Sequence, residues 1–93
     1  MKRNFFNVSL CKNGLLGGLL YVEDTELLYR TNKLTVPEKI RRLHIPYSEI
    51  LQIEKAPFHT VIVSMKNDEK YRFLVFARAK FMDKVNGYAN VRN

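Results

Sequence analysis

Side chains that could act as nucleophiles or metal ligands are few in this sequence. One cysteine, Cys11, and two histidines, His44 and His59, occur among the 93 residues. A structural zinc site needs Cys, His or acidic ligands at short spacings, and a nucleophilic cysteine needs a neighbouring base or cation that promotes its thiolate form. The sequence around Cys11, His44 and His59 shows neither the ligand spacing of a zinc site nor a histidine or acidic residue paired with the cysteine. We therefore interpret the histidines as surface or turn residues and the thiol as a buried or half-buried structural group, and we expect no metal and no cofactor.

The acidic residues fall mainly in two short clusters that are typical of turns. They are Glu23, Asp24 and Glu26 in the first cluster, and Asp68 and Glu69 in the second. Turns favour polar residues, and nothing nearby in the sequence suggests the environment that shifts the pKa of a catalytic carboxylate. The glycine-rich segment 13–18 has neither the spacing nor the Lys-Ser/Thr pair of a phosphate-binding loop. The sequence therefore predicts that this protein is not an enzyme.

Positive charge is the clearest chemical feature of the chain. Lysine and arginine number 16 against 9 acidic residues, which gives a formal charge of +7. The densest basic segment spans residues 33–42, where only Glu38 is acidic. Its basic residues are Lys33, Lys39, Arg41 and Arg42. Near an anionic membrane surface each basic residue contributes about 1 kcal/mol of attraction. We predict that these four residues contact anionic lipid or another anion; the competing interpretation is a charged surface that serves only solubility.

Leu15 and Leu16 stand between glycines in the predicted loop 13–18. Two adjacent leucines there either face the core or form an exposed apolar tip. An exposed tip beside basic residues could enter the interfacial region of a membrane as a small wedge. Both interpretations remain open from the sequence, so Leu15 and Leu16 are a candidate membrane-facing loop.

Alternating apolar and polar residues predict about seven short strands that carry these side chains. The segments are residues 6–10, 19–22, 27–29, 43–45, 50–54, 60–66 and 71–75. Gly17 and Gly18 predict a bend or a bulge, and Leu51 and Ile53 are expected on one face of their strand. Pro37 excludes a central strand in the basic segment. Short strands joined by turns favour an antiparallel barrel or sandwich.

The hydrophobic period changes near the C-terminus, where Phe81, Val85 and Tyr88 recur at the spacing of one helix face. We predict a single amphipathic helix over residues 78–88 and a frayed tail at residues 90–93. The fold class is then mainly β (α+β): an antiparallel barrel or sandwich of about seven strands, closed by one C-terminal helix.

Length and hydropathy limit the organisation and location of the protein. Residues 1–93 suffice for one domain with one core. No stretch reaches the roughly 20 apolar residues that span a bilayer, and polar residues interrupt the N-terminal apolar run that a signal peptide would need. We expect a cytoplasmic protein that meets a membrane, if at all, peripherally at its inner surface.

Three short strings, taken in order, resemble the GRAM branch of the pleckstrin-homology (PH) superfold and the related bacterial PH-like domains. They are GLLYV followed by LLY (18–22 and 27–29), IPYSEI (45–50), and KYRFLVF leading into RAKF (70–76 and 78–81). The resemblance implies a non-catalytic interaction module with a PH-like barrel, in which Phe81 plugs the open end. The basic residues that flank the first hairpin of phosphoinositide-binding PH domains are represented here by Lys12 alone.

The sequence leaves three functional hypotheses. The first is a PH-like module that binds an anionic membrane surface or a protein partner. The alternative is a small basic β-barrel that binds nucleic acid through stacking aromatics; it is less favoured, because most aromatic residues fall on the apolar phase of their strands. The third is a homo-oligomer formed by edge-strand pairing, with residues 5–10 as an exposed edge.

Overall fold

The computed structural model describes residues 4–12 and 14–89, so the predicted fraying of residues 90–93 lies outside the described part of the chain. The elements in chain order are β1 (Phe5–Cys11), β2 (Leu15–Val22), β3 (Glu26–Arg30), α1 (Glu38–Arg41), β4 (Arg42–Pro46), the 3₁₀ turn η1 (Tyr47–Glu49), β5 (Ile50–Ala56), β6 (Thr60–Met65), β7 (Lys70–Val75) and α2 (Arg78–Ala89). The predicted fold class is confirmed: the chain is mainly β, with antiparallel strands followed by one C-terminal helix.

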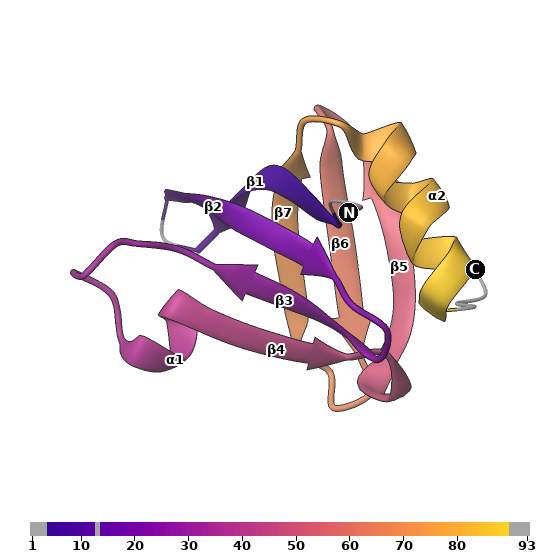
Figure 1. The fold of residues 1–93 in the computed structure, drawn as a ribbon, viewed down its shortest axis with the longest axis horizontal. Helices are drawn as coiled ribbons and strands as arrows, with labels where there is room; N and C mark the ends of the chain where they lie inside the picture. Colours follow the sequence, from indigo (N-terminus) through magenta and orange to yellow (C-terminus); the bar gives the residue numbers. More distant parts are fainter. Residues whose placement is uncertain (1–3, 13, 90–93) are drawn as a thin grey trace.

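Among the described residues, the strands form one antiparallel sheet in the order β4-β3-β2-β1-β7-β6-β5. The sheet bends, so that the part containing β2, β3 and β4 crosses the part containing β5, β6 and β7 (Figure 1). Its two edges are β4 and β5, so the sheet is not closed into a barrel. β1 pairs with β2 on one side and with β7 on the other. The prediction that residues 5–10 form an exposed edge is therefore wrong, because alternation reveals which face is buried and not how many neighbours a strand has.

The core fills the space between the two parts of the bent sheet (Figure 1), and Phe81 and Val85 of α2 are buried in it. Its largest fully buried side chains are Tyr29, Phe73, Phe81, Leu20, Leu27, Ile45 and Ile53. The ring of Phe81 packs edge-on against Phe6, with ring centroids 5.5 Å apart and planes at 86°. This T-shaped geometry is one of the two favoured arrangements of aromatic pairs. Phe81 therefore closes the core from the helix side.

Gly17 and Gly18 do not form a bend, because β2 continues through both in unbroken register with β1. Gly18 is required for close packing instead. A Cβ atom at this position would lie 2.4 Å from the Arg30 carbonyl oxygen and 2.8 Å from the Tyr29 ring, whereas a Cβ at Gly17 would meet nothing within 4 Å. The glycine pair is thus a packing feature of the β2–β3 contact.

A β-bulge at the start of β5 overturns one predicted face. The pairing with β6 shifts between Ile50 and Gln52, which breaks the alternation of a regular strand. Ile50 and Ile53 are consequently buried, and Leu51 is exposed. The expectation that Leu51 shares a face with Ile53 is wrong for this reason.

The basic segment 33–42, where Pro37 excludes a central strand, contains one short helix, α1. The Pro37 carbonyl oxygen accepts hydrogen bonds from the Ile40 and Arg41 amides at 2.9 and 3.1 Å. Proline suits the start of a helix, because its missing N–H and fixed φ cost nothing there. The turn directs Ile40 onto the core, and this contact fixes where the adjacent basic residues lie.

Candidate anion-binding site

The β3–β4 pair ends in three arginines that lie close together. Arg30 is the last residue of β3 and Arg42 the first of β4, and the two are directly opposite in the antiparallel register. Just beyond them, the Thr31 amide donates to the Arg41 carbonyl oxygen at 3.0 Å. A shallow pocket here is lined by Arg30, Thr31, Glu38, Arg41 and Arg42. The end of the β3–β4 pair is therefore a concentrated positive site, which we call the arginine pocket.

No carboxylate pairs with these guanidinium groups within the described part of the chain. The ion pair found there joins His44 to Glu26, with 3.0 Å between Nδ1 and Oε2. Glu38 lines the arginine pocket without an ion pair to any of its residues. Like charges directly opposite on neighbouring strands destabilise a sheet. An anion bound in the pocket would therefore lower the electrostatic energy of the site.

Two side-chain hydrogen bonds hold the backbone on either side of Arg30. The Tyr29 hydroxyl donates to the Leu16 carbonyl oxygen at 2.6 Å, and the Thr31 hydroxyl donates to the Gly17 carbonyl oxygen at 2.7 Å. Burial raises the pKa of the Tyr29 phenol, although the hydrogen bond with Thr31 acts in the opposite direction. The two residues that flank Arg30, Tyr29 and Thr31, are thus both hydrogen-bonded to β2.

The structure brings together only some of the predicted anion-contacting residues. Arg41 and Arg42 line the arginine pocket. Lys33 lines a neighbouring hollow, which it shares with Arg30. Lys39 is exposed on α1 and lines neither of the two. Sequence reasoning misses Arg30, because this residue ends a strand outside the basic segment; the β3–β4 register is the signal that could have placed it opposite Arg42.

Leu15 and Leu16 do not form a loop, because both belong to β2 and pair with β1. Their side chains point in opposite directions, as alternation along a strand requires. Leu16 packs against the core, whereas Leu15 is 66% exposed. The prediction of a membrane-facing loop is wrong for Leu16, and it is correct only in the exposure of Leu15.

A second exposed leucine lies near the same site. Leu34 follows Lys33 and is 81% exposed. An apolar hollow joins the β1–β2 hairpin to the α1 segment, with Leu15, Val36 and Ile40 in its lining. Both segments lie at the left-hand end of the molecule in Figure 1. We call this the basic end, defined by Lys12, Leu15, Arg30, Lys33, Leu34, Lys39, Arg41 and Arg42.

The basic residues of α2 do not join the basic end. Figure 1 shows α1 and the β1–β2 turn on the left and α2 on the right. The guanidinium of Arg78 donates to the carbonyl oxygens of Ala56 and Thr60, which flank the β5–β6 loop. Positive charge is therefore presented at two separate ends of the molecule.

The residues considered first for nucleophilic or metal chemistry lie apart. His44 is exposed and pairs with Glu26, His59 is exposed in the β5–β6 loop, and Cys11 is half-buried at the end of β1. Across residues 4–12 and 14–89 no three Cys, His or acidic side chains are grouped so that they could hold a metal ion. The helices of this part of the chain include none long and apolar enough to cross a membrane.

Comparison with known proteins gives information on the fold. No protein-family model matches the sequence, and no curated protein matches it. Among solved structures, the C-terminal domain of an unknown protein from Leishmania infantum is similar, with a TM-score of 0.79 and 16% sequence identity. The match covers 92% of this chain and 81% of the other. At this identity the similarity shows a shared fold and nothing about function.

Proposed function

We propose that this protein is a non-catalytic PH-like, GRAM-type interaction module that binds an anionic membrane surface through its basic end. The observation that carries the proposal is the arginine pocket, where Arg30 and Arg42 face each other and neither forms an ion pair among the described residues. The exposed side chains of Leu15 and Leu34 at the same end supply apolar groups. Cations beside exposed leucines are the combination that favours the boundary between lipid headgroups and acyl chains.

The strength of such binding follows from its components. Each cation near an anionic surface contributes about 1 kcal/mol, and a fully buried leucine side chain contributes about 1.5–3 kcal/mol. The leucines enter the interfacial region only in part, so charge provides most of the attraction. The proposed attachment is therefore peripheral, reversible and sensitive to salt, because exposed charges are screened within about 10 Å at 0.1 M ionic strength.

Two features support a PH-like module over a nucleic-acid-binding barrel. The strand order and the C-terminal helix agree with the layout that the sequence resemblance implies. The aromatic side chains Tyr29, Phe73 and Phe81 are fully buried and cannot stack on bases. The exposed Phe58 and Phe76 lie outside the basic end. Among the residues that define the basic end none is aromatic, so a single strand bound there would lack the base-stacking contacts that usually accompany a charged groove.

Co-sedimentation with phosphatidylcholine vesicles, with and without phosphatidylserine, tests the proposal. We expect the wild-type protein to bind only vesicles that contain phosphatidylserine. The double reversal Arg41→Glu/Arg42→Glu should weaken that binding by roughly tenfold or more, because it removes two attractive charges and adds two repulsive ones.

The double reversal Lys55→Glu/Lys80→Glu is the matched control. It changes the net charge by the same amount on β5 and α2, away from the basic end, and should leave vesicle binding nearly unchanged. Equal losses in both variants would mean that net charge acts without a defined site. Absence of wild-type binding at low salt would overturn the proposal, and retention of a single-stranded oligonucleotide by the basic end would replace lipid with nucleic acid.

A further inference from the structure

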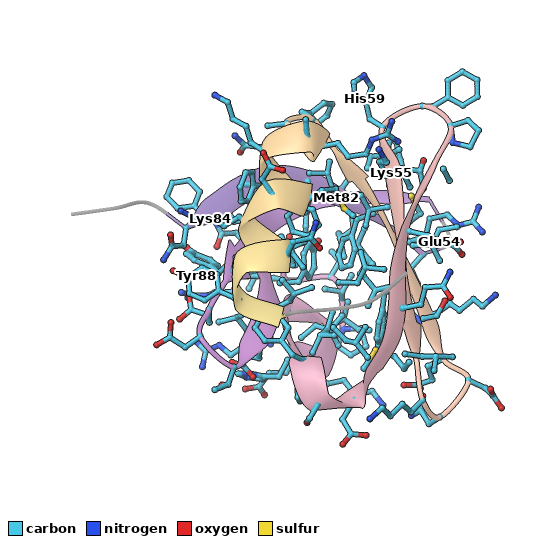
Figure 2. All side chains as sticks on the ribbon, turned by 90° about the vertical axis from the view of Figure 1, so that its right-hand side faces the viewer. Glu54, Lys55, His59, Met82, Lys84 and Tyr88 are labelled. Atoms are coloured by element: carbon cyan, nitrogen blue, oxygen red, sulfur yellow. The ribbon has the colours of Figure 1, made fainter. Side chains whose placement is uncertain are left out.

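The loop between β5 and β6 presents an unusually exposed aromatic side chain. Phe58 is 88% exposed, the highest value of any large apolar residue in the described part of the chain. Phe76, in the connection from β7 to α2, is 65% exposed. Phe76 and His59 line one hollow at the start of α2. Figure 2 shows His59 near the first turn of α2. We call Phe58, His59 and Phe76 the aromatic tip.

The backbone of the aromatic tip is strained. Phe58 and His59 have φ angles of 63° and 60°, in the left-handed region that costs a residue with a Cβ atom about 1–2 kcal/mol. The other non-glycine residue with positive φ in the described chain is Asp68, a type that tolerates this conformation. Asparagine and glycine would satisfy the β5–β6 loop with less strain. Strained backbone of this kind concentrates at functional positions.

Hydrogen bonds hold the aromatic tip in place. The Arg78 guanidinium donates to the carbonyl oxygen of Ala56 and to that of Thr60, the latter at 3.1 Å, so it joins both sides of the loop to α2. The Val75 amide donates to the His59 carbonyl oxygen at 2.9 Å. A preorganised aromatic group loses little conformational entropy on binding. The backbone that carries the aromatic tip is therefore anchored to α2 and β7.

The charges around the aromatic tip are positive. The hollow is lined by His59, Phe76, Ala77, Arg78, Ala79 and Lys80, with no carboxylate among these described residues. Lys55 is exposed near the end of β5, where Glu54 is its acidic neighbour (Figure 2). The Arg78 guanidinium donates to neutral carbonyl groups and forms no ion pair among the described residues. A ligand complementary to this surface combines an apolar side chain with carboxylates.

We infer that the aromatic tip docks an acidic segment of a protein partner, with an apolar side chain of that segment against Phe58 and Phe76. Carboxylates of the segment face Arg78 and Lys80. Aromatic residues, phenylalanine included, and arginine are enriched in protein interfaces relative to the rest of the surface. Figure 1 shows the β5–β6 loop and the start of α2 at the top of the molecule and α1, which belongs to the basic end, at the left. A bilayer that contacts the basic end therefore does not by that contact cover the hollow, which stays accessible to a peptide. The comparison with a bilayer rests on the proposed function, whereas the proposed contact between the peptide and the aromatic tip does not.

Selection from a displayed library of random peptides tests the inference. The wild-type protein should enrich peptides in which aspartate or glutamate flanks an apolar residue. A synthetic copy of the most enriched peptide, labelled for fluorescence anisotropy, then gives affinities for variants. The decisive variant is Phe58→Asn/His59→Gly, which places residues suited to positive φ in the loop. It should be at least as stable to urea as the wild type and should bind the peptide roughly tenfold or more weakly.

Two further variants separate this inference from the proposed function. Lys80→Glu should weaken peptide binding, whereas Arg41→Glu/Arg42→Glu should leave peptide binding unchanged while it reduces binding to phosphatidylserine vesicles. The inference is overturned if the library yields no acidic peptides or if the Phe58→Asn/His59→Gly variant binds the selected peptide as the wild type does. It is also overturned if the fluorescence of the Phe58→Trp variant shifts to the blue with vesicles, since the aromatic tip would then face the bilayer.

Discussion

Arg30 and Arg42 occupy directly opposite positions in the antiparallel β3–β4 pair, at the point where the ladder ends. Opposite residues on neighbouring strands have Cβ atoms about 4.5–5.5 Å apart, and like charges there are unfavourable. Neither arginine has an ion-pair partner among the described residues. The repulsion within this pair therefore lowers the stability of the free protein. An anion bound there would be attracted by both guanidinium groups, which links the stability of the fold to the proposed binding.

The variant Arg42→Glu should separate these two effects. Replacing the repulsion with an attraction to Arg30 should raise the free energy of unfolding by about 0.2–1 kcal/mol, while binding to phosphatidylserine vesicles becomes weaker. Urea denaturation and vesicle co-sedimentation measure the two quantities. Arg72→Glu is the control, because Arg72 is exposed and lies opposite the apolar Ile62. An equal gain of stability in both variants would show that reduced net charge, and not this pair, is responsible.

The orientation on the membrane can be read from single tryptophans, because the chain contains none. Leu34→Trp places a fluorophore at the exposed leucine of the basic end. Its emission should shift to the blue with phosphatidylserine vesicles, because the ring leaves water for the interfacial region. Phe58→Trp, at the aromatic tip, should show no shift under the same conditions. A blue shift at residue 58 and none at residue 34 would reverse the proposed orientation.

The adjacent glycines of β2 should respond in opposite ways to the same substitution. Gly18→Ala forces a methyl group against the Arg30 carbonyl and the Tyr29 ring, so it should destabilise the protein by about 1–3 kcal/mol. Gly17→Ala meets open space and should be neutral or stabilise by up to about 1 kcal/mol, since glycine within a strand is entropically unfavourable. Urea denaturation of both variants measures the difference. Comparable losses in the two would contradict the packing role of Gly18.

Much of the fold could be predicted because one face of most strands is buried. In β6 and β7 the alternation of Val61, Val63, Phe73 and Val75 matches their burial, so the strands and their inward faces follow from hydropathy alone. The helix was predictable because Phe81 and Val85, both buried, lie one turn apart.

The remaining features depend on long-range pairing, which local patterns do not encode. The bulge that exposes Leu51 arises from the β5–β6 register. Arg30 joins the arginine pocket only because β4 returns beside β3 after the α1 segment. The left-handed backbone at Phe58 and His59 also escapes sequence reasoning, because phenylalanine does not signal a positive φ and histidine signals it only weakly.

Tyr47 predicts a loss of stability at alkaline pH that a single variant can isolate. Burial, and secondarily the charge of Glu23, raises the pKa of the Tyr47 phenol above its ordinary value, and its hydroxyl donates to the Glu23 carbonyl oxygen at 2.6 Å. In the unfolded chain the phenol ionises near pH 10. The contribution of Tyr47 is therefore fully present below about pH 10 and is lost as the pH rises above it, because the unfolded state then releases the proton more readily.

Tyr47→Phe should cost about 1 kcal/mol at pH 7 through the lost hydrogen bond, yet the stability of this variant should fall less steeply above pH 10 than that of the wild type. Urea denaturation between pH 7 and about pH 11 compares the two slopes, and Tyr29 and Tyr71, which titrate in both proteins, cancel from the comparison. Parallel slopes would show that Tyr47 ionises equally easily in the folded and unfolded states.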